Sequence, residues 1–382
     1  MIDEAQYLAL VQTVLWLSFG LTFLLGYFSQ STHFCTMGAL ADIYSFGSWV
    51  RASQVMTAMA ISVLGFACLV ALGYLDPQKT LYASQKFFWL SNAIGGTMFG
   101  AGMVLASGCG NKTLIRMGTG NLKSWVVFVF MGFAALATLK GVTAVFRVNV
   151  LETYFWLLPQ GADWGHLLPV FSADATQNQV VMGLFVGALL LVLAWLGCGF
   201  NQEASEGLVS WQRAKDLWPG LVVGLIITAA WFLSAHWGHV QENPLTLEEV
   251  FLASSSGKEE SLTFVSPMAY LIEWLIYFSD QSRVLNYACV CALGVVSGAF
   301  VNALIKGQLR WESFSGLRDL SSHLVGALLM GIGGVIAMGC TFGQGLSGLS
   351  TLSLNAFEVV VFIVLGAQIA FRYQNYLLEK EL

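Results

Sequence analysis

Charged residues are scarce in this chain of 382 residues. Asp, Glu, Lys and Arg together make up 10% of it, and 57% of its residues are hydrophobic. Soluble domains carry about 25% charged residues. So few charged side chains cannot cover a water-facing surface, which excludes a soluble globular protein. The composition predicts an all-α polytopic membrane protein, with residues 1–382 forming a single integral membrane domain in the lipid bilayer.

Basic tracts are also missing, and the net charge is −5, so we expect no nucleic-acid partner. The N-terminus, MIDEAQ, lacks the basic residues of a signal peptide, so the first apolar stretch is expected to remain as a helix. GCGNKT at 108–113 resembles the end of a phosphate-binding loop, but Asn111 separates its glycine from its lysine. No cofactor is therefore expected.

Apolar runs of about 20 residues, the length that crosses a bilayer, recur along the chain. Seven runs are long enough, at 7–28, 52–75, 122–140, 178–199, 218–237, 284–305 and 354–371. Two shorter runs, 90–107 and 322–339, each end at a glycine–cysteine pair, and a weaker run covers 264–278. We expect about 8–10 spanning helices together with short re-entrant half-helices.

Lys and Arg near the ends of the spans predict the orientation, because cytoplasmic loops carry an excess of them. The residues placed on the cytoplasmic side are Arg51, Arg213, Lys215, Lys306, Arg310, Arg318 and Arg372. The acidic N-terminus and the connectors 146–177 and 240–262 then lie outside. This pattern predicts an external N-terminus and a cytoplasmic C-terminus.

Two glycine-rich blocks repeat each other at a constant offset of 231 residues. GGTMFGAGMVLASGCG (95–110) and GALLMGIGGVIAMGCT (326–341) are identical at seven of sixteen positions. The identical pairs are Gly95/Gly326, Gly100/Gly331, Gly102/Gly333, Val104/Val335, Ala106/Ala337, Gly108/Gly339 and Cys109/Cys340. We therefore expect a two-fold internal repeat, with halves at about 7–140 and 284–372 and a variable middle at about 141–283.

Duplicated apolar runs that stop at a glycine are typical of the discontinuous helices that line transporter binding sites. Irregular backbone at membrane depth is tolerated only where protein or a water-filled cavity surrounds it. We interpret 90–118 and 322–350 as re-entrant half-helices that turn near the midplane, at Cys109 and Cys340.

A third break, STHFCTMGALAD at 31–42, carries Cys35. Its expected equivalent in the second half is 297–311, where Phe300 can be set against Phe34.

Three of the seven cysteines, Cys35, Cys109 and Cys340, lie in these glycine-rich breaks. The other four, Cys68, Cys198, Cys289 and Cys291, lie in apolar spans and are expected to pack as small hydrophobic residues. None of the three has a C-x-x-C or H-x-x-H neighbour, so no metal site is expected, and paired disulfide exchange is disfavoured. Two interpretations remain open. The thiols either fill tight helix crossings or line a pathway for a soft anion.

A pathway for a soft anion accounts for the residues around the thiols. A polarizable sulfur with a weak S–H donor suits a sulfur-bearing guest. Gly108, Gly110 and Gly339 would let backbone N–H groups approach that guest, while Lys112 and Arg116 would attract it. Each site must hold the anion weakly enough to release it.

HFCTMGALAD, FGAGMVLASGCGNKTLIR and MGIGGVIAMGCTFGQGLSGLSTLSLNAF resemble the motifs of the YeeE/YedE family of sulphur-transport membrane proteins. With their flanking helices they cover most of residues 25–140 and 290–372. The resemblance implies a helical fold of two related halves, with an hourglass outline, in the bacterial inner membrane. It also implies that the protein is a transporter, not an enzyme, and takes up thiosulfate or a related sulfur-containing anion.

The same resemblance implies roles for single residues. Cys35, Cys109 and Cys340 correspond to three pore cysteines that pass thiosulfate inward through S–H hydrogen bonds without covalent change. Arg116 corresponds to the arginine seven residues beyond the second of these cysteines. A small cytosolic sulfur-carrier protein with a reactive cysteine is the implied partner, for which the basic segment 306–318 is a candidate docking surface.

The first motif departs from the family pattern at two charged positions. The family often has an arginine where this chain has Ser31, and an Arg-Asp pair where it has Ala41 and Asp42. Lys112 is a candidate substitute for the missing charges, or the guest is another sulfur or selenium species. The alternative function is that of a membrane thiol oxidoreductase or sulfur-trafficking protein.

Overall fold

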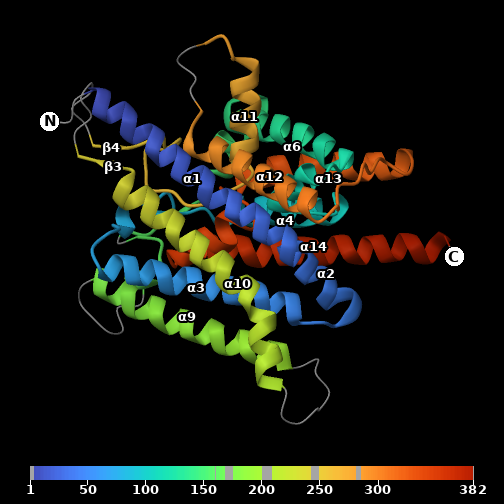
Figure 1. Ribbon diagram of the computed structural model, residues 1–382, viewed down its shortest axis with the longest axis horizontal. Helices are drawn as coiled ribbons and strands as arrows, with labels where there is room; N and C mark the ends of the chain where they lie inside the picture. Colours follow the sequence, from blue (N-terminus) through green and yellow to red (C-terminus); the bar gives the residue numbers. More distant parts are fainter. Residues whose placement is uncertain are drawn as a thin grey trace.

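The computed structural model describes residues 4–159, 161–167, 175–199, 209–241, 249–280 and 285–381. A bundle of long helices forms its framework (Figure 1). These are α1 Glu4–Thr32, α3 Val50–Ala71, α4 Trp89–Leu105, α6 Leu122–Lys140, α9 Ala175–Gly199, α10 Val209–Phe232, α12 Tyr287–Ile305, α13 Leu317–Ile336 and α14 Leu354–Glu381. Within the described residues, nine helical stretches are long and apolar enough to cross a membrane. The predicted all-α polytopic membrane protein is confirmed.

Short elements connect these helices. The short helices are α2 Thr36–Phe46, α5 Gly110–Gly118, α7 Val142–Phe146, α8 Trp164–Leu167, α11 Ser266–Ile276 and the tighter or wider turns η1 Pro77–Lys79, η2 Arg147–Leu151, η3 Leu233–Trp237 and η4 Gly343–Gly348. Two antiparallel ribbons pair β1 Lys86–Phe87 with β2 Trp156–Leu157, and β3 His239–Val240 with β4 Val250–Phe251.

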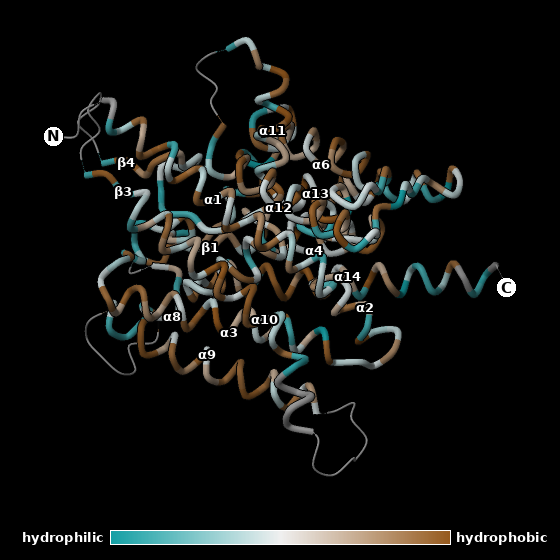
Figure 2. Tube along the Cα trace, viewed as in Figure 1, coloured by the Kyte–Doolittle hydropathy of each residue, from teal (hydrophilic) through white to brown (hydrophobic). Residues whose placement is uncertain are grey.

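The bundle has two polar ends and an apolar middle. We call the end where α1 begins the N-terminal face and the end where α14 finishes the C-terminal face (Figure 1). Figure 2 shows hydrophobic segments along the middle of the bundle and hydrophilic ones at the end of α14. Large apolar side chains stand exposed on the outside, including Trp16 on α1 at 72% and Phe185 on α9 at 60%. Such a surface suits contact with lipid.

The repeat glycines lie where helices meet backbone to backbone. A Cβ on Gly102 would lie 2.7 Å from the carbonyl oxygen of Gly326, and a Cβ on Gly326 would lie 2.7 Å from that of Gly102. This reciprocal contact joins α4 to α13. Gly100 and Gly331, which occupy equivalent positions in the two blocks, contact other helices, since a Cβ on Gly100 would collide with α14 and a Cβ on Gly331 with α6. The duplicated glycines therefore allow close helix packing.

The packing contacts match between the two halves when α10, α12, α13 and α14 are set against α1, α3, α4 and α6. α1 packs on α12 while α10 packs on α3, and α4 packs on α14 while α13 packs on α6. The short helices follow the same rule, since α2 packs on α3 and α11 on α12. This is the arrangement of two repeats of opposite topology, and α9 separates the two repeats in the sequence. We infer that the second repeat half begins at α10, not near residue 284.

The prediction that 297–311 is the equivalent of the Cys35 loop is wrong. Residues 287–305 form one unbroken helix, α12, on which Phe300 is exposed. The glycine of SGAF, Gly298, marks close packing and not a break, because a Cβ there would collide with the backbone of Phe23 on α1. The structure places Phe264, just before α11, in the position that corresponds to Phe34.

The loops of the N-terminal face contain a buried carboxylate, Glu259. Its backbone N–H donates to the Lys79 carbonyl at 3.1 Å, and its own carbonyl accepts from the Leu81 N–H at 2.9 Å. The side chain is 3% exposed, and burial raises the pKa of this carboxyl to about 7.

Glu259→Gln is expected to stabilise the protein at pH 8 by about 1 kcal/mol, with little effect at pH 5. Between the ordinary pKa of 4.5 and about 7, the folded state keeps a proton that the unfolded state has lost, so native stability falls as pH rises. Thermal unfolding in detergent at both pH values measures the difference. Glu379→Gln, at an exposed position on α14, is the control. An equal gain at both pH values would contradict the assignment.

Candidate functional site

The three predicted breaks share one backbone geometry. In each, the residue two before the cysteine has a positive φ although it is not glycine, which is an uncommon conformation. These residues are His33, Ser107 and Met338, with φ of 54°, 55° and 54°. Cys35 then caps α2, Cys109 caps α5, and Cys340 lies three residues before η4. A strained turn that recurs before each thiol marks the three breaks as one kind of site.

The pieces after the breaks are short, whereas those before the two repeat cysteines are nearly full spans. α4 has 17 residues and α13 has 20, which corresponds to about 25 and 30 Å. α5 has nine residues and η4 has six. Seven of the nine residues of α5 and all six of η4 are buried, so these short elements form the interior of the site.

Cys35 and Cys109 lie together in the interior. Their side chains interact directly, and they are 8% and 1% exposed. The N–H of Gly38 donates to the Cys35 Sγ at 3.2 Å. Residues 74 positions apart in the chain are thus brought into contact by the breaks before α2 and α5.

Hydroxyl groups connect this pair to Cys340. Thr36 Oγ1 lies 3.5 Å from Cys109 Sγ and 3.1 Å from Thr341 Oγ1, and Thr341 directly follows Cys340. The Cys340 Sγ accepts from the Gly343 N–H at 3.3 Å. Cys340 is also close enough to Cys109 to interact with it electrostatically. The three thiols therefore converge, with threonine hydroxyls between them.

A cavity of about 180 Å³ lies next to Cys340. Its lining includes Tyr82, Arg147, Thr263 and Gln344. Thr263 Oγ1 lies 3.9 Å from the Cys340 Sγ. The Cys340 thiol therefore lies directly behind the lining of this cavity.

An apolar wall stands beside the thiols. Phe342 has its ring centroid 6.2 Å from that of Phe34 and 5.3 Å from that of Phe264, and all three rings are buried. The rings come from the Cys35 break, the Cys340 break and the segment just before α11. They fill the space around the sulfhydryls and leave the thiols and hydroxyls as the polar groups at the centre.

The predicted glycines have different surroundings. A Cβ on Gly339 would lie 2.9 Å from Gln344 Cγ, and one on Gly108 would lie 3.2 Å from Lys112 Cγ. A Cβ on Gly110 would lie 3.4 Å from Phe264 Cβ, which is an ordinary contact. Gly339 and Gly108 thus leave room for polar side chains, whereas Gly110 has space for a methyl group.

Neither of the two predicted cations lines the cavity. Lys112 is half-buried and close enough to Cys35 and Cys109 to interact with both electrostatically. Arg116 Nη1 donates to the Ser107 carbonyl at 2.9 Å. Arg116 therefore fastens the strained turn before Cys109, while Lys112 faces the thiols.

The sequence interpretation missed three threonines. Thr36 and Thr341 each follow a break cysteine, so the repeated Cys-Thr dipeptide was a signal for both. Thr263 comes from the middle of the chain, where no motif pointed to it. Across the described ranges, no group of three or more His, Cys, Asp or Glu residues is placed to hold a metal ion.

Comparisons with known proteins bear on the family of the whole chain. The profile of a family described as "Sulphur transport" matches residues 31–369. A relative named "Thiosulfate transporter TsuA" from Escherichia coli is 26% identical over 360 residues, covering 90% of this chain and 90% of the relative. A relative of the same name from Spirochaeta thermophila is 25% identical, covering 92% of this chain and 97% of the relative. "Probable transporter YedE" from Escherichia coli is 29% identical, covering 49% of this chain and 42% of the relative.

Proposed function

Because this chain belongs to the sulphur transport family, we propose that it carries thiosulfate, or a closely related sulfur-containing anion, across the bacterial cytoplasmic membrane. Two relatives that align along nearly all of the chain are named thiosulfate transporters. The observation that carries the proposal is the convergence of three buried thiols, one of which, Cys340, lies 3.9 Å from a residue that lines a cavity, Thr263.

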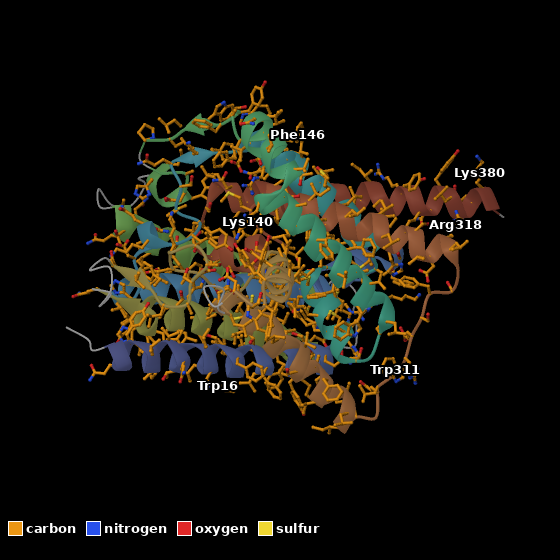
Figure 3. All side chains as sticks on the ribbon, turned by 90° about the horizontal axis from the view of Figure 1, so that it is seen from above. Trp16, Lys140, Phe146, Trp311, Arg318 and Lys380 are labelled. Carbon is orange, nitrogen blue, oxygen red and sulfur yellow. The ribbon has the colours of Figure 1, made fainter. Side chains whose placement is uncertain are left out.

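The N-terminal face would lie outside the cell and the C-terminal face in the cytoplasm. Helix ends at the C-terminal face carry many of the basic residues, and Figure 3 shows Arg318 and Lys380 there. The others are Arg51, Lys215, Lys306, Arg310 and Arg372. Cytoplasmic ends are enriched in Lys and Arg, which supports this orientation. The side chain of Arg213 and residues 1–3, 168–174 and 242–248 lie outside the described residues.

Each thiol would hold the anion through its S–H group. The sulfur of Cys340 already accepts from the Gly343 N–H, and that of Cys35 from the Gly38 N–H. Neither of these two contacts uses an S–H hydrogen, so each thiol could turn its S–H group toward a guest. A thiol is a weak donor, so each contact is easily broken, as permeation requires. The anion would pass from Cys340 to Cys109 and then to Cys35.

Uptake into vesicles tests this function. Purified protein reconstituted in lipid vesicles is expected to accumulate labelled thiosulfate well above protein-free vesicles, and labelled sulfate and selenite much less. Sulfate uptake equal to thiosulfate uptake would contradict a site selective for sulfur-bearing anions. Absence of thiosulfate uptake would overturn the proposal itself.

The contact between Cys35 and Cys109 also favours a second candidate, a membrane thiol oxidoreductase or sulfur-trafficking protein. Oxidation of these thiols to a disulfide would release two protons and two electrons to a sulfur-containing acceptor. Alkylation under non-reducing conditions, followed by mass spectrometry, separates the two functions. A Cys35–Cys109 disulfide that forms and disappears with substrate supports the enzyme. Thiols that stay free during uptake support the transporter.

A cytosolic sulfur-carrier protein would receive the anion at the C-terminal face. The segment between α12 and α13 presents Trp311 at 81% exposure, and the first turn of α13 presents Leu317 at 85%. The basic residues beside them are Lys306, Arg310 and Arg318. This basic and apolar surface suits a partner with a complementary acidic rim. Trp311→Ala is expected to weaken binding of a purified carrier without lowering carrier-independent uptake. Unchanged binding would place the contact elsewhere.

A further inference from the structure

We infer that Lys112, Arg51 and Lys306 form a second anion site between Cys35 and the C-terminal face, suited to a small doubly charged oxyanion. The inference rests on the proposed function for the identity of its ligand. It concerns a different part of the pathway, since the thiols hold the anion in the interior and this site would receive it at the exit. We call these three residues the exit cations.

The exit cations come from three separate elements. Lys112 lies on α5, Arg51 at the start of α3, and Lys306 just after α12. His33, in the break before Cys35, lies within electrostatic range of all three. Lys112 is likewise within range of Arg51. The fold therefore brings together three residues that are far apart in the sequence.

Two glycines let these cations approach the thiols. A Cβ on Gly38 would lie 3.1 Å from Arg51 Nη1 and 3.5 Å from Cys35 Sγ, so the guanidinium and the thiol border the same space. A Cβ on Gly108 would lie 3.2 Å from Lys112 Cγ. An anion that leaves Cys35 would therefore meet Arg51 and Lys112 directly.

Anchoring contacts hold two of the exit cations in place. Arg51 Nε lies 3.3 Å from Asp42 Oδ2, and Lys306 Nζ donates to Ser31 Oγ at 2.8 Å. Lys112 forms no ion pair with any residue that the structure describes. The three exit cations together with the Asp42 carboxylate carry a net charge of +2, and Arg116 adds a further positive charge within electrostatic range of Lys112. This excess of positive charge suits a doubly charged anion.

The charged residues around His33 also indicate an anion site. The charged residues that influence it are Lys112, Arg51 and Lys306, all cations. Like charges held close together repel, so their convergence is unfavourable without a counter-ion. Water reaches the site, because Arg51 has a side-chain exposure of 43% and both His33 and Lys306 are exposed. Water weakens each contact, which suits release.

A charged-reagent assay tests the site without using the transported anion. His33→Cys, in a chain that also carries Cys68→Ser, provides a reporter thiol among the exit cations. The anionic sulfonatoethyl methanethiosulfonate is expected to modify it at least about fivefold faster than the cationic trimethylammonium reagent, relative to a free thiol. Adding Lys112→Gln and Lys306→Gln should bring the ratio close to that of the free thiol. High salt should do the same.

Lys380→Gln is the matched control, because it removes one positive charge at the same face but at the far end of α14 (Figure 3). It should leave the ratio unchanged. A reporter that shows no preference for the anionic reagent would overturn the inference. A preference that survives loss of Lys112 and Lys306, or falls equally with Lys380→Gln, would overturn it as well.

Uptake in the otherwise native chain supplies a second measurement. Lys112→Gln is expected to lower thiosulfate uptake about tenfold at low ionic strength. Lys112→Arg should restore most of it, because the charge is kept. Equal uptake by Lys112→Gln and the native protein would count against the site. If the native protein takes up no thiosulfate, the proposed function fails, and the reagent assay still decides whether an anion site exists.

Discussion

Cys109→Ala is expected to reduce thiosulfate uptake at least about 100-fold, which corresponds to about 2.7 kcal/mol of lost stabilisation at the barrier. Cys109 occupies the middle of the proposed pathway. It interacts with Cys35 on one side and accepts from Thr36 Oγ1 on the other. Alanine would remove the S–H donor and leave the Thr36 hydroxyl without its sulfur partner. Labelled thiosulfate uptake into vesicles measures the loss.

Two further variants make this result specific. Cys68→Ala changes an exposed cysteine on α3 and should leave uptake at the native level. Cys109→Ser keeps a hydrogen-bond donor but replaces the polarizable sulfur. It should retain measurable uptake if the anion moves by hydrogen bonds alone, and none if the thiol must be oxidised. Native uptake by Cys109→Ala would remove the thiols from the pathway.

The sequence predicted the framework because the information for it is local. Each spanning helix is an apolar run, and each break before a cysteine is a run that stops at a polar or glycine-rich turn. The repeat could be recognised in the sequence because both glycine blocks lie in the same contact, in which α4 and α13 pack together at Gly102 and Gly326. The backbones of the two helices lie so close that only glycine fits between them. The same glycine pattern therefore occurs in two distant segments.

The equivalent of α2 was not predictable in the same way. Its counterpart α11 follows Phe264, but no cysteine stands before it as Cys35 stands before α2. Gly298 was interpreted as part of a break in the helix, but it lies inside α12, where it allows close packing on α1. Glycine marks both turns and close packing, and the residue alone does not distinguish them. The order of packing partners does, because α11 packs on α12 as α2 packs on α3.

The charges absent from the first motif illustrate a second limit. Ser31 and Ala41 carry no charge, yet Lys306 donates to Ser31 and Arg51 pairs with Asp42, next to Ala41. Both cations come from other parts of the chain. Lys306 is 275 positions from Ser31. A cation can be supplied to the same place by any helix that reaches it, so the motif alone could not reveal these two.

Gly100→Ala is expected to destabilise the folded protein by about 2–3 kcal/mol, because the added methyl group would meet backbone and not a movable side chain. A Cβ at this position would collide with the Ile363 carbonyl on α14. Gly331→Ala, the repeat equivalent, should behave alike, since its Cβ would collide with the Met131 carbonyl on α6. Thermal unfolding in detergent measures both.

Gly20→Ala is the matched control for these two variants. Gly20 lies inside α1 with nothing within 4 Å of a Cβ, so the same substitution should be neutral or stabilise by about 0.5–1 kcal/mol. A loss at Gly100 and Gly331 with none at Gly20 would tie the effect to helix contact and not to helix propensity. Equal effects at all three positions would mean that α4 and α13 do not depend on glycine for their approach to α14 and α6. The close packing of α4 and α13 would then not be what holds the turns before Cys109 and Cys340 in position.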